Sequence, residues 1–260
     1  MGQNRMERPL SAAEILLQSL GIEKASEIDL EAVAWSVGVI GIRIRPLDGC
    51  EARIAGHAGR AIISVKQGVR ETRQRFSICH ELGHWHHHRG QLLYCKSEDM
   101  HQREIANAKE GAANRYASDM LLPPYLLMPR LEGCTKVDLA VVEETANEFR
   151  ASFTATAIKL AQMISTPTMI VCHDKHGRRW HVQGPKVPRE WFPRSDLDTR
   201  SLAFHALFEK GREQRAPRKI KANAWFERFD AERHEITEQS FRPEDGMVIT
   251  ILSMPHLSLR

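Results

Sequence analysis

Two histidines and a glutamate lie close together in the chain, in the order His80-Glu81-Leu82-Gly83-His84. On an α-helix, residues four apart lie one above the other, so the imidazoles of His80 and His84 can reach one metal ion. Glu81 points about 100° around the same helix, beside the open position of the metal, where a carboxylate can take a proton from bound water. This pattern is typical of zinc-assisted hydrolysis, in which the metal lowers the pKa of that water to about 7.

The residues around this motif favour a continuous helix. Residues 69–89 contain no proline, and Gly83 is their only glycine. Glycine costs about 1 kcal/mol of helix propensity relative to alanine, so its presence indicates that another backbone approaches closely here. A second helix that carries a further ligand would need such an approach.

A catalytic zinc usually has three protein ligands and leaves its fourth position to water. The best candidate for the third ligand is Glu110, because it belongs to an apolar stripe at helical spacing. The stripe consists of Ala106, Glu110, Ala113, Ala117 and Met120 with Leu121. A carboxylate on such a buried face is costly unless it is paired or bound to a metal. Glu104 and Asp119 are rival ligands, and the alternative for Glu110 is a partly exposed side chain that pairs with lysine or arginine.

Together, the two motifs resemble the ImmA/IrrE family of bacterial zinc metallopeptidases. The first matching block consists of Phe76, His80, Glu81, Leu82, Gly83 and His84. The second consists of Glu110, Ala113, Asn114, Tyr116, Ala117, Leu121, Leu122 and Pro123. The similarity extends more loosely to residues 28–65 and 138–164.

This resemblance implies that His80, His84 and Glu110 hold Zn²⁺ and that Glu81 is the general base of an endopeptidase. It also implies a narrow substrate, because these peptidases typically cleave a helix-turn-helix transcriptional repressor, often encoded nearby. Cleavage then relieves repression in a stress or mobile-element response. The rival interpretation is a non-proteolytic, zinc-stabilised DNA-binding regulator or antirepressor. An intact Glu81 disfavours it, since a structural zinc site would not need this carboxylate.

The composition indicates a cytoplasmic protein. The chain has 260 residues, 42% of them hydrophobic and 27% charged, enough for one large or two small domains. No apolar run approaches the roughly 18 residues of a membrane helix, and no signal peptide opens the chain. Five scattered cysteines favour reduced thiols, and Cys79 is expected to pack the helix rather than to bind metal. The net charge of +4 allows an acidic partner without requiring one.

The hydrophobic pattern predicts an α+β fold in three parts. Residues 1–137 are expected to form a zincin-like metallopeptidase domain, mostly helical with a small sheet. Its expected elements are helices at 11–20 and 29–37, the first capped by Ser11, and strands at 39–45 and 61–65. An edge strand of this sheet could pair with an extended substrate peptide, and a purely structural sheet is the alternative.

Residues 138–166 are expected to form a helix-turn-helix-like pair, with helices at 138–149 and 153–164 and Ser152 as a cap. The outward side of the second helix is expected to carry Thr154, Thr156, Lys159 and Gln162. One cation is few for a helix that binds DNA, so domain packing is favoured over DNA contact. Any binding of duplex DNA is therefore expected to be weak.

Residues 167–260 are expected to form a small C-terminal α+β domain with a sensory or partner-binding role. The pattern predicts a hairpin at 169–182, a helix near 199–210, and strands around 223–229, 235–241 and 247–252. The basic stretch at 210–221 is more typical of a solvated loop than of a nucleic-acid patch. His88, four residues after His84, is either a further polar group at the zinc site or a cation at the helix end.

Overall fold

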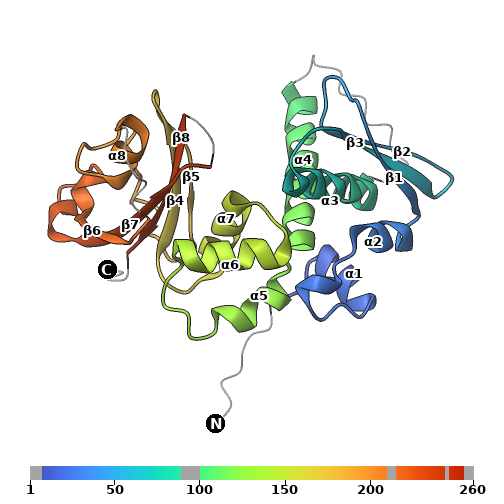
Figure 1. Cartoon of the computed structure of the whole chain (residues 1–260), viewed down its shortest axis with the longest axis horizontal. Helices are drawn as coiled ribbons and strands as arrows, with labels where there is room; N and C mark the ends of the chain where they lie inside the picture. The colour runs from blue at the N-terminus through green and yellow to red at the C-terminus, as the bar shows by residue number, and fades with distance from the viewer. Residues whose placement is uncertain (1–7, 89–99, 210–214, 244–245, 255–260) are drawn as a thin grey trace, which may run out of the picture. The chain divides into compact units, whose positions relative to one another are not determined.

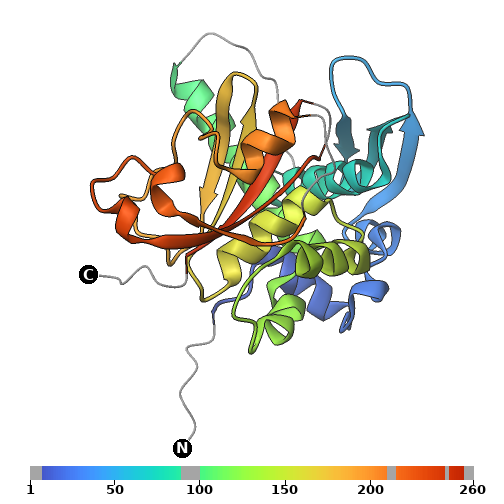
Figure 2. The same cartoon turned by 60° about the vertical axis from the view of Figure 1, so that its left-hand side comes forward.

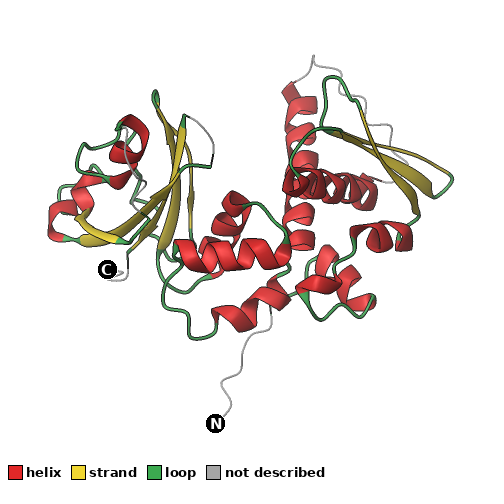
Figure 3. Ribbon diagram, viewed as in Figure 1, coloured by secondary structure: helices red, strands yellow, loops and turns green. Residues whose placement is uncertain are grey.

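The structure is a computed structural model that describes residues 8–88, 100–209, 215–243 and 246–254, with their side chains except those of 88 and 100–106. The chain divides into two compact units. The first consists of the described residues up to Leu127 together with Glu148–Ala151, and the second of Met128–Asn147 and those from Ser152 onward. Both units contain helices and strands (Figure 3), which confirms the predicted α+β class.

The first unit begins with the short helices α1 (Ala12–Ser19) and α2 (Leu30–Ser36), joined through the 3-10 turn η1 (Ala25–Glu27). Ser11 caps α1 as predicted. Its backbone N–H donates to the Glu14 carboxylate at 2.9 Å, and its hydroxyl accepts from the backbone N–H of Glu14 at 3.4 Å. This reciprocal pair satisfies two backbone donors and fixes the start of the helix.

A three-stranded sheet follows, in the order β1-β3-β2. The predicted strands β1 (Val39–Arg45) and β3 (Arg60–Lys66) are parallel, and β2 (Ala52–His57) pairs antiparallel with β3 at the edge. The sequence did not predict β2, because its six residues include a single β-branched side chain. A tight turn at Ala58 and Gly59, with φ of 50° and 79°, returns the chain into β3 and sets the pairing.

Two long helices, α3 (Glu71–His88) and α4 (Met100–Leu121), cross beside this sheet (Figure 1). α3 packs on β2 and β3 and also along α4. The sheet residues that face the helix are buried: Ala61, Ile63 and Val65. After Pro123, the chain continues as α5 (Pro124–Leu131). No helix in the described ranges combines the length and the apolar character needed to cross a membrane.

The predicted helical pair is present as α6 (Leu139–Phe149) and α7 (Phe153–Met163). The Ser152 hydroxyl caps α7 by accepting from the N–H of Ala155 at 3.2 Å, as predicted. The predicted outward side of α7 is wrong for Thr156 and Lys159, which are both buried, whereas Gln162 is exposed as predicted and Thr154 is half-buried. The Thr156 hydroxyl donates to the Ser152 carbonyl at 3.0 Å, so it can be buried without losing a hydrogen bond. α7 packs on the C-terminal sheet and is not a free recognition helix.

That sheet has five antiparallel strands in the order β5-β4-β8-β7-β6. They are β4 (Thr168–Asp174), β5 (Gly177–Gln183), β6 (Arg218–Lys221), β7 (Glu235–Phe241) and β8 (Met247–Ser253). Figure 2 shows the hairpin of β4 and β5 beside β8. α7 packs on β4 and β5, and α8 (Leu202–Phe208) packs on β7 and β8. The hairpin, the helix and the strands predicted at 235–241 and 247–252 are confirmed.

The strand predicted around 223–229 is wrong. β6 ends at Lys221, and the chain turns through the 3-10 segment η2 (Ala222–Ala224), with a further 3-10 segment η3 (Ala231–Arg233) before β7. Trp225 and Phe226 are buried in the core of this unit. The aromatic residues at 225 and 226 are therefore explained by burial in this core and not by a β-strand.

Candidate metal centre

α3 carries the histidine motif, as predicted. His80 and His84 lie one turn apart, and their Nε2 atoms are 3.0 Å from each other. His84 is buried, while His80 opens onto a cavity. The two rings therefore present nitrogen atoms to one point in space.

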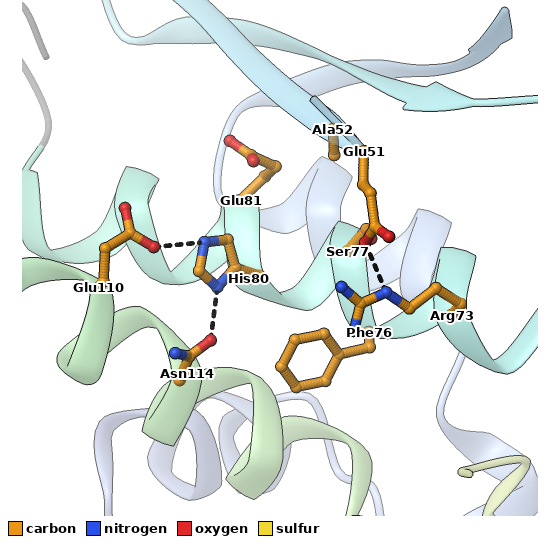
Figure 4. Close-up of a pocket in the computed structure, with 9 residues that line it drawn as sticks. All are labelled: Glu51, Ala52, Arg73, Phe76, Ser77, His80, Glu81, Glu110 and Asn114. Carbon is orange, nitrogen blue, oxygen red and sulfur yellow. Dashed lines mark hydrogen bonds and ion pairs between the residues drawn. The ribbon is translucent and has the colours of Figure 1, made fainter. Parts of the chain in front are cut away.

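Glu110, on α4, completes a group of three. One carboxylate oxygen is 3.2 Å from Nε2 of His80, and the other is 3.3 Å from Nε2 of His84. Figure 4 marks the contact with His80. Within the described ranges, these three side chains form a group whose ligand atoms all lie within 4.8 Å of one another and could hold a metal ion.

The three separations match the space that a tetrahedral ion requires. Bonds of about 2.0–2.1 Å from zinc to nitrogen and oxygen donors place neighbouring donors roughly 3.3 Å apart. The two histidine nitrogens are 3.0 Å apart, and each lies 3.2 or 3.3 Å from a different oxygen of the Glu110 carboxylate, so each separation taken singly is close to this edge length. The residues present therefore fit a small divalent cation, with two imidazoles and one carboxylate as donors.

Glu110 lies at the open side of the site, and the expectation that it occupies a buried face is wrong. Its side chain is 54% exposed, because it lines the cavity beside His80. The rest of the apolar stripe is confirmed, since Ala113, Ala117, Met120 and Leu121 are buried. The side chain of Ala106 lies outside the described residues. The stripe packs α4 against its neighbours, and Glu110 lies at the end of this contact, where the cavity opens.

Gly83 permits the close contact of α3 and α4, as predicted. A Cβ atom at Gly83 would lie 2.9 Å from Cα and 3.0 Å from the carbonyl oxygen of Ala113, and 3.1 Å from Cβ of Tyr116. Non-bonded carbon atoms prefer separations of about 3.5–4.0 Å, so any larger residue must push the two helices apart. Gly83 and Ala113 thereby set the distance between Glu110 and the histidines.

Asn114 supports the site in a way that the sequence analysis missed. Its side-chain oxygen is 3.0 Å from Nδ1 of His80 (Figure 4). An acceptor at this position keeps the proton of the neutral ring on Nδ1, which leaves Nε2 free to bind a metal. Asn114 follows Glu110 by one helical turn, and this spacing was the available signal.

Glu81 lies near His80 and Glu110 in Figure 4, which also labels Ala52, the first residue of β2. Burial raises the pKa of its carboxyl group to about 7, with a contribution from the Glu110 carboxylate, while a hydrogen bond from the backbone N–H of Ile54 acts in the opposite direction. A divalent cation held by the neighbouring ligands would lower this pKa again, because its charge would dominate locally. A carboxyl group in this range can accept and release a proton near neutral pH.

A cavity of about 300 Å³ opens in front of these side chains. Its further lining comes from α3, from Ala52 at the start of β2 and from the residue just before it: Glu51, Ala52, Arg73, Phe76 and Ser77 (Figure 4). Arg73 pairs with Glu51, and its guanidinium lies 5.6 Å from the centre of the Phe76 ring. The cavity thus offers an apolar ring and an ion pair next to the candidate metal site.

The sequence also offered Asp119, Glu104, His88 and Cys79 for consideration at this site. Asp119 is not one of its members. The side chains of Glu104 and His88 lie outside the described residues. Cys79 is fully buried, and burial raises the pKa of its thiol to about 12, which suits the expected packing role.

Two of three comparisons with known proteins found a match. Residues 37–161 match the family model described as the IrrE N-terminal-like domain, peptidase M78. A solved structure of a Mycobacterium tuberculosis transcriptional regulator has a TM-score of 0.61 and 15% identity, over 94% of this chain and 86% of that chain. At this identity, the likeness concerns the fold alone. None of the curated proteins compared with the chain matches it. The matched range contains both histidines, Glu81 and Glu110, and residues 37–161 of this chain belong to the IrrE N-terminal-like, peptidase M78 family.

Proposed function

We propose that this protein is a zinc-dependent endopeptidase. The observation that carries the proposal is the meeting of His80, His84 and Glu110 at one point, with Glu81 beside them and an open cavity in front. Two imidazoles and a carboxylate are a common donor set of catalytic zinc sites, which keep one position for water or substrate. The peptidase M78 match supports the same chemistry.

The roles of the chain's own residues follow from their contacts. Zn²⁺ at this site would polarise a peptide carbonyl and lower the pKa of a water molecule to about 7. The Glu81 carboxylate is the base that takes a proton from the attacking water and delivers it to the nitrogen of the departing amine. The Ile54 N–H holds this carboxylate in place, and Asn114 orients the ring of His80.

β2 is suited to hold a substrate in an extended conformation. It is an edge strand, and the carbonyl of Glu51, just before its first residue, accepts from the Lys66 N–H of β3 at 2.8 Å. Because successive residues of a strand point their backbone groups in opposite directions, the N–H and C=O of Ala52 point away from β3. Ala52 also lines the cavity. An exposed, extended peptide can add there as a further strand.

We propose further that the substrate is a helix-turn-helix transcriptional repressor, whose cleavage relieves repression in a stress or mobile-element response. The support is the family resemblance together with the need for an extended segment. A linker in a DNA-binding repressor meets this need better than a compact core. We therefore expect a discrete cut in one partner protein and negligible hydrolysis of casein.

The test uses the full-length protein with zinc and the helix-turn-helix regulator encoded nearest to its gene. The native sequence should cut the regulator at a discrete site. Glu81→Gln should keep stoichiometric zinc, because Glu81 is not a proposed ligand, and lose about 10²–10⁴-fold in cleavage rate. Zinc content is measured by elemental analysis of the same samples. Full activity of Glu81→Gln would remove the proposed base.

Ligand variants test the metal site separately. His80→Ala, His84→Ala and Glu110→Ala should each lose zinc, because two ligands hold the ion far less firmly than three. Asp119→Asn is the matched control on α4 and should keep it. Zinc retained by Glu110→Ala and lost by Asp119→Asn would show that the third ligand is misassigned.

A further inference from the structure

The sheet of the first unit carries a concentration of positive charge. Its strands β1, β2 and β3 contain four arginines and one lysine but no aspartate or glutamate. The five cations are Arg43, Arg45, Arg53, Arg60 and Lys66. The whole chain has a net charge of only +4, so the charge of +5 on these three strands exceeds the net charge of the entire protein.

The strand register places these cations on one face, which we call the outer face. The buried hydrophobic residues of β3 are alternate residues of the strand: Ala61, Ile63 and Val65. Because successive side chains of a strand point to opposite faces, Ser64 and Lys66 lie on the side away from α3, although Ser64 is buried there and Lys66 is exposed. Arg43 of β1 and Arg53 of β2 both stand opposite Ser64, and Arg45 stands opposite Lys66. Rows of cations thus cross the sheet on its outer face.

These cations are exposed and uncompensated. All five are exposed to solvent, and none has an ion-pair partner in the part of the chain that the structure describes. The Arg45 guanidinium instead donates to the Ser64 hydroxyl at 2.5 Å. Glu51, in the connection between β1 and β2, pairs with Arg73 of α3. Like charges gathered in this way attract counterions, and a polyanion that displaces them gains free energy from their release.

We propose that the outer face is a docking surface for the sugar–phosphate backbone of duplex DNA. Arginine binds phosphate through two parallel hydrogen bonds, and four of the five cations are arginines. Neighbouring strands lie about 4.8 Å apart, and alternate residues of one strand about 6.7 Å apart. The cations therefore form a grid that matches a surface of closely repeated charges and not a single anion.

The chemistry of the outer face favours a duplex over a single strand. β1, β2 and β3 contain no phenylalanine, tyrosine or tryptophan. Sheets that bind single-stranded nucleic acid use such rings to stack the bases. The strands also lack asparagine and glutamine, which read base edges. The cations are therefore suited mainly to the phosphate backbone, whose contacts position a protein on the duplex without reading its sequence.

This docking surface does not depend on the proposed proteolysis. A duplex bound there would nevertheless hold the protein close to a repressor that occupies its operator. The helical pair is a poor alternative surface, because Lys159 of α7 is buried. The sequence favoured domain packing over DNA contact for the helical pair at 138–164, and the proposed DNA contact lies instead on the sheet of β1, β2 and β3.

Fluorescence anisotropy of a short, labelled duplex of mixed sequence tests the proposal with the full-length protein. The wild type should bind and lose affinity steeply between about 50 and 200 mM salt. Arg43→Gln/Arg53→Gln removes two phosphate contacts, so the logarithmic salt slope should fall by about 2 and binding at low salt should weaken at least about tenfold. Lys175→Gln/Lys186→Gln removes the same charge from exposed positions of the second unit and should leave both quantities nearly unchanged. Arg60→Gln, next to the turn into β3, is a second variant should the double one fail to fold.

Several outcomes would overturn the proposal. One is the absence of duplex binding by the wild type at about 50 mM salt. Another is equal binding by the arginine variant and the lysine control. Binding of poly-L-glutamate that duplex DNA cannot displace would identify an acidic protein as the occupant instead. Glu81→Gln should bind the duplex like the wild type without cleaving the repressor. Arg43→Gln/Arg53→Gln should still cleave a free repressor. The two variants therefore distinguish failure of the proposed DNA binding from failure of the proposed proteolysis.

Discussion

Gly83→Ala is the sharpest perturbation of the candidate site, because it adds one carbon atom at the crossing of α3 and α4. The new Cβ would lie 2.9 Å from Cα of Ala113 and 3.0 Å from its carbonyl oxygen. Both are backbone atoms, so no side-chain rotation can relieve the contact. The helices must separate by about 0.5–1 Å to restore ordinary carbon contacts. Glu110 lies on α4 just before Ala113 and must move with it.

Two opposing terms set the magnitude. Alanine gains about 1 kcal/mol of helix propensity over glycine. Overpacking a tight contact costs about 1–3 kcal/mol. We therefore expect a net loss of about 0–2 kcal/mol in the free energy of unfolding. The effect on the metal is larger, because ligand distances tolerate only about 0.2 Å of error. Zinc affinity should fall roughly 10–100-fold, as it does when a supporting contact of a metal site is lost.

Gly111→Ala is the matched control, since Gly111 lies in the middle of α4 and next to the candidate ligand. A Cβ there would meet only the end of the flexible Arg115 side chain, at 3.4 Å. This variant should gain up to about 1 kcal/mol of stability and keep its zinc affinity. Urea unfolding and competitive zinc titration of both variants provide the comparison. A Gly83→Ala protein as stable as Gly111→Ala, with unchanged zinc affinity, would refute the role assigned to the helix contact.

Three further predictions concern other parts of the chain. Asn114→Ala should weaken zinc binding about 10–100-fold without loss of fold, because the His80 ring loses its acceptor; titration with a chelator measures this. Burial lowers the pKa of His173 to about 4, below its ordinary 6.5. Between these two values the unfolded chain binds a proton at this residue that the folded chain does not bind. The free energy of unfolding should therefore fall by about 3 kcal/mol as the pH drops from about 6.5 to 4. Urea unfolding should show this loss in the wild type and in the exposed-site control His176→Gln, but much less in His173→Gln. A fragment that ends at Thr166 keeps every candidate ligand and should bind zinc. It lacks β4 and β5, on which α7 packs, so it should self-associate, which light scattering measures. A fragment that does not bind zinc would show that the first unit needs residues 167–260.

The features that the sequence predicted depend on local spacing. The motif on α3 follows from the separation of His80 and His84 by one helical turn. The cap of α1 follows from Ser11 and Glu14, three residues apart. Gly83 predicted a close helix contact because an unexplained glycine in a helix indicates that another backbone approaches there. For the motif and the cap, the physical cause acts within one or two turns. The partner of Gly83 is distant in the chain, but the cost of a glycine inside a helix can be seen in the sequence itself.

The features that it missed depend on partners distant in the chain. β2 has weak intrinsic preference for a strand and forms because the turn at Ala58 and Gly59 aligns it with β3. Glu110 belongs to an apolar stripe, yet it is exposed because a cavity opens where the stripe ends. Thr156 and Lys159 occupy positions that helical periodicity assigns to solvent, and they are nevertheless buried. Periodicity identifies which residues share a face, but it does not identify what covers that face.

β2 connects the two proposals of this structure, because its alternate residues serve different surfaces. The N–H of Ile54 donates to Glu81, whereas Arg53 lies on the outer face opposite Ser64. Arg53 also belongs to the set of positions whose backbone groups pair with β3, as Glu51 does with Lys66. Arg53→Gln removes the charge and keeps the strand, so duplex binding should fall while cleavage of a free repressor continues. Arg53→Pro also removes a ladder hydrogen bond. It should therefore displace Ile54 from Glu81 and reduce cleavage as well, and equal cleavage rates for the two variants would show that β2 does not position the base.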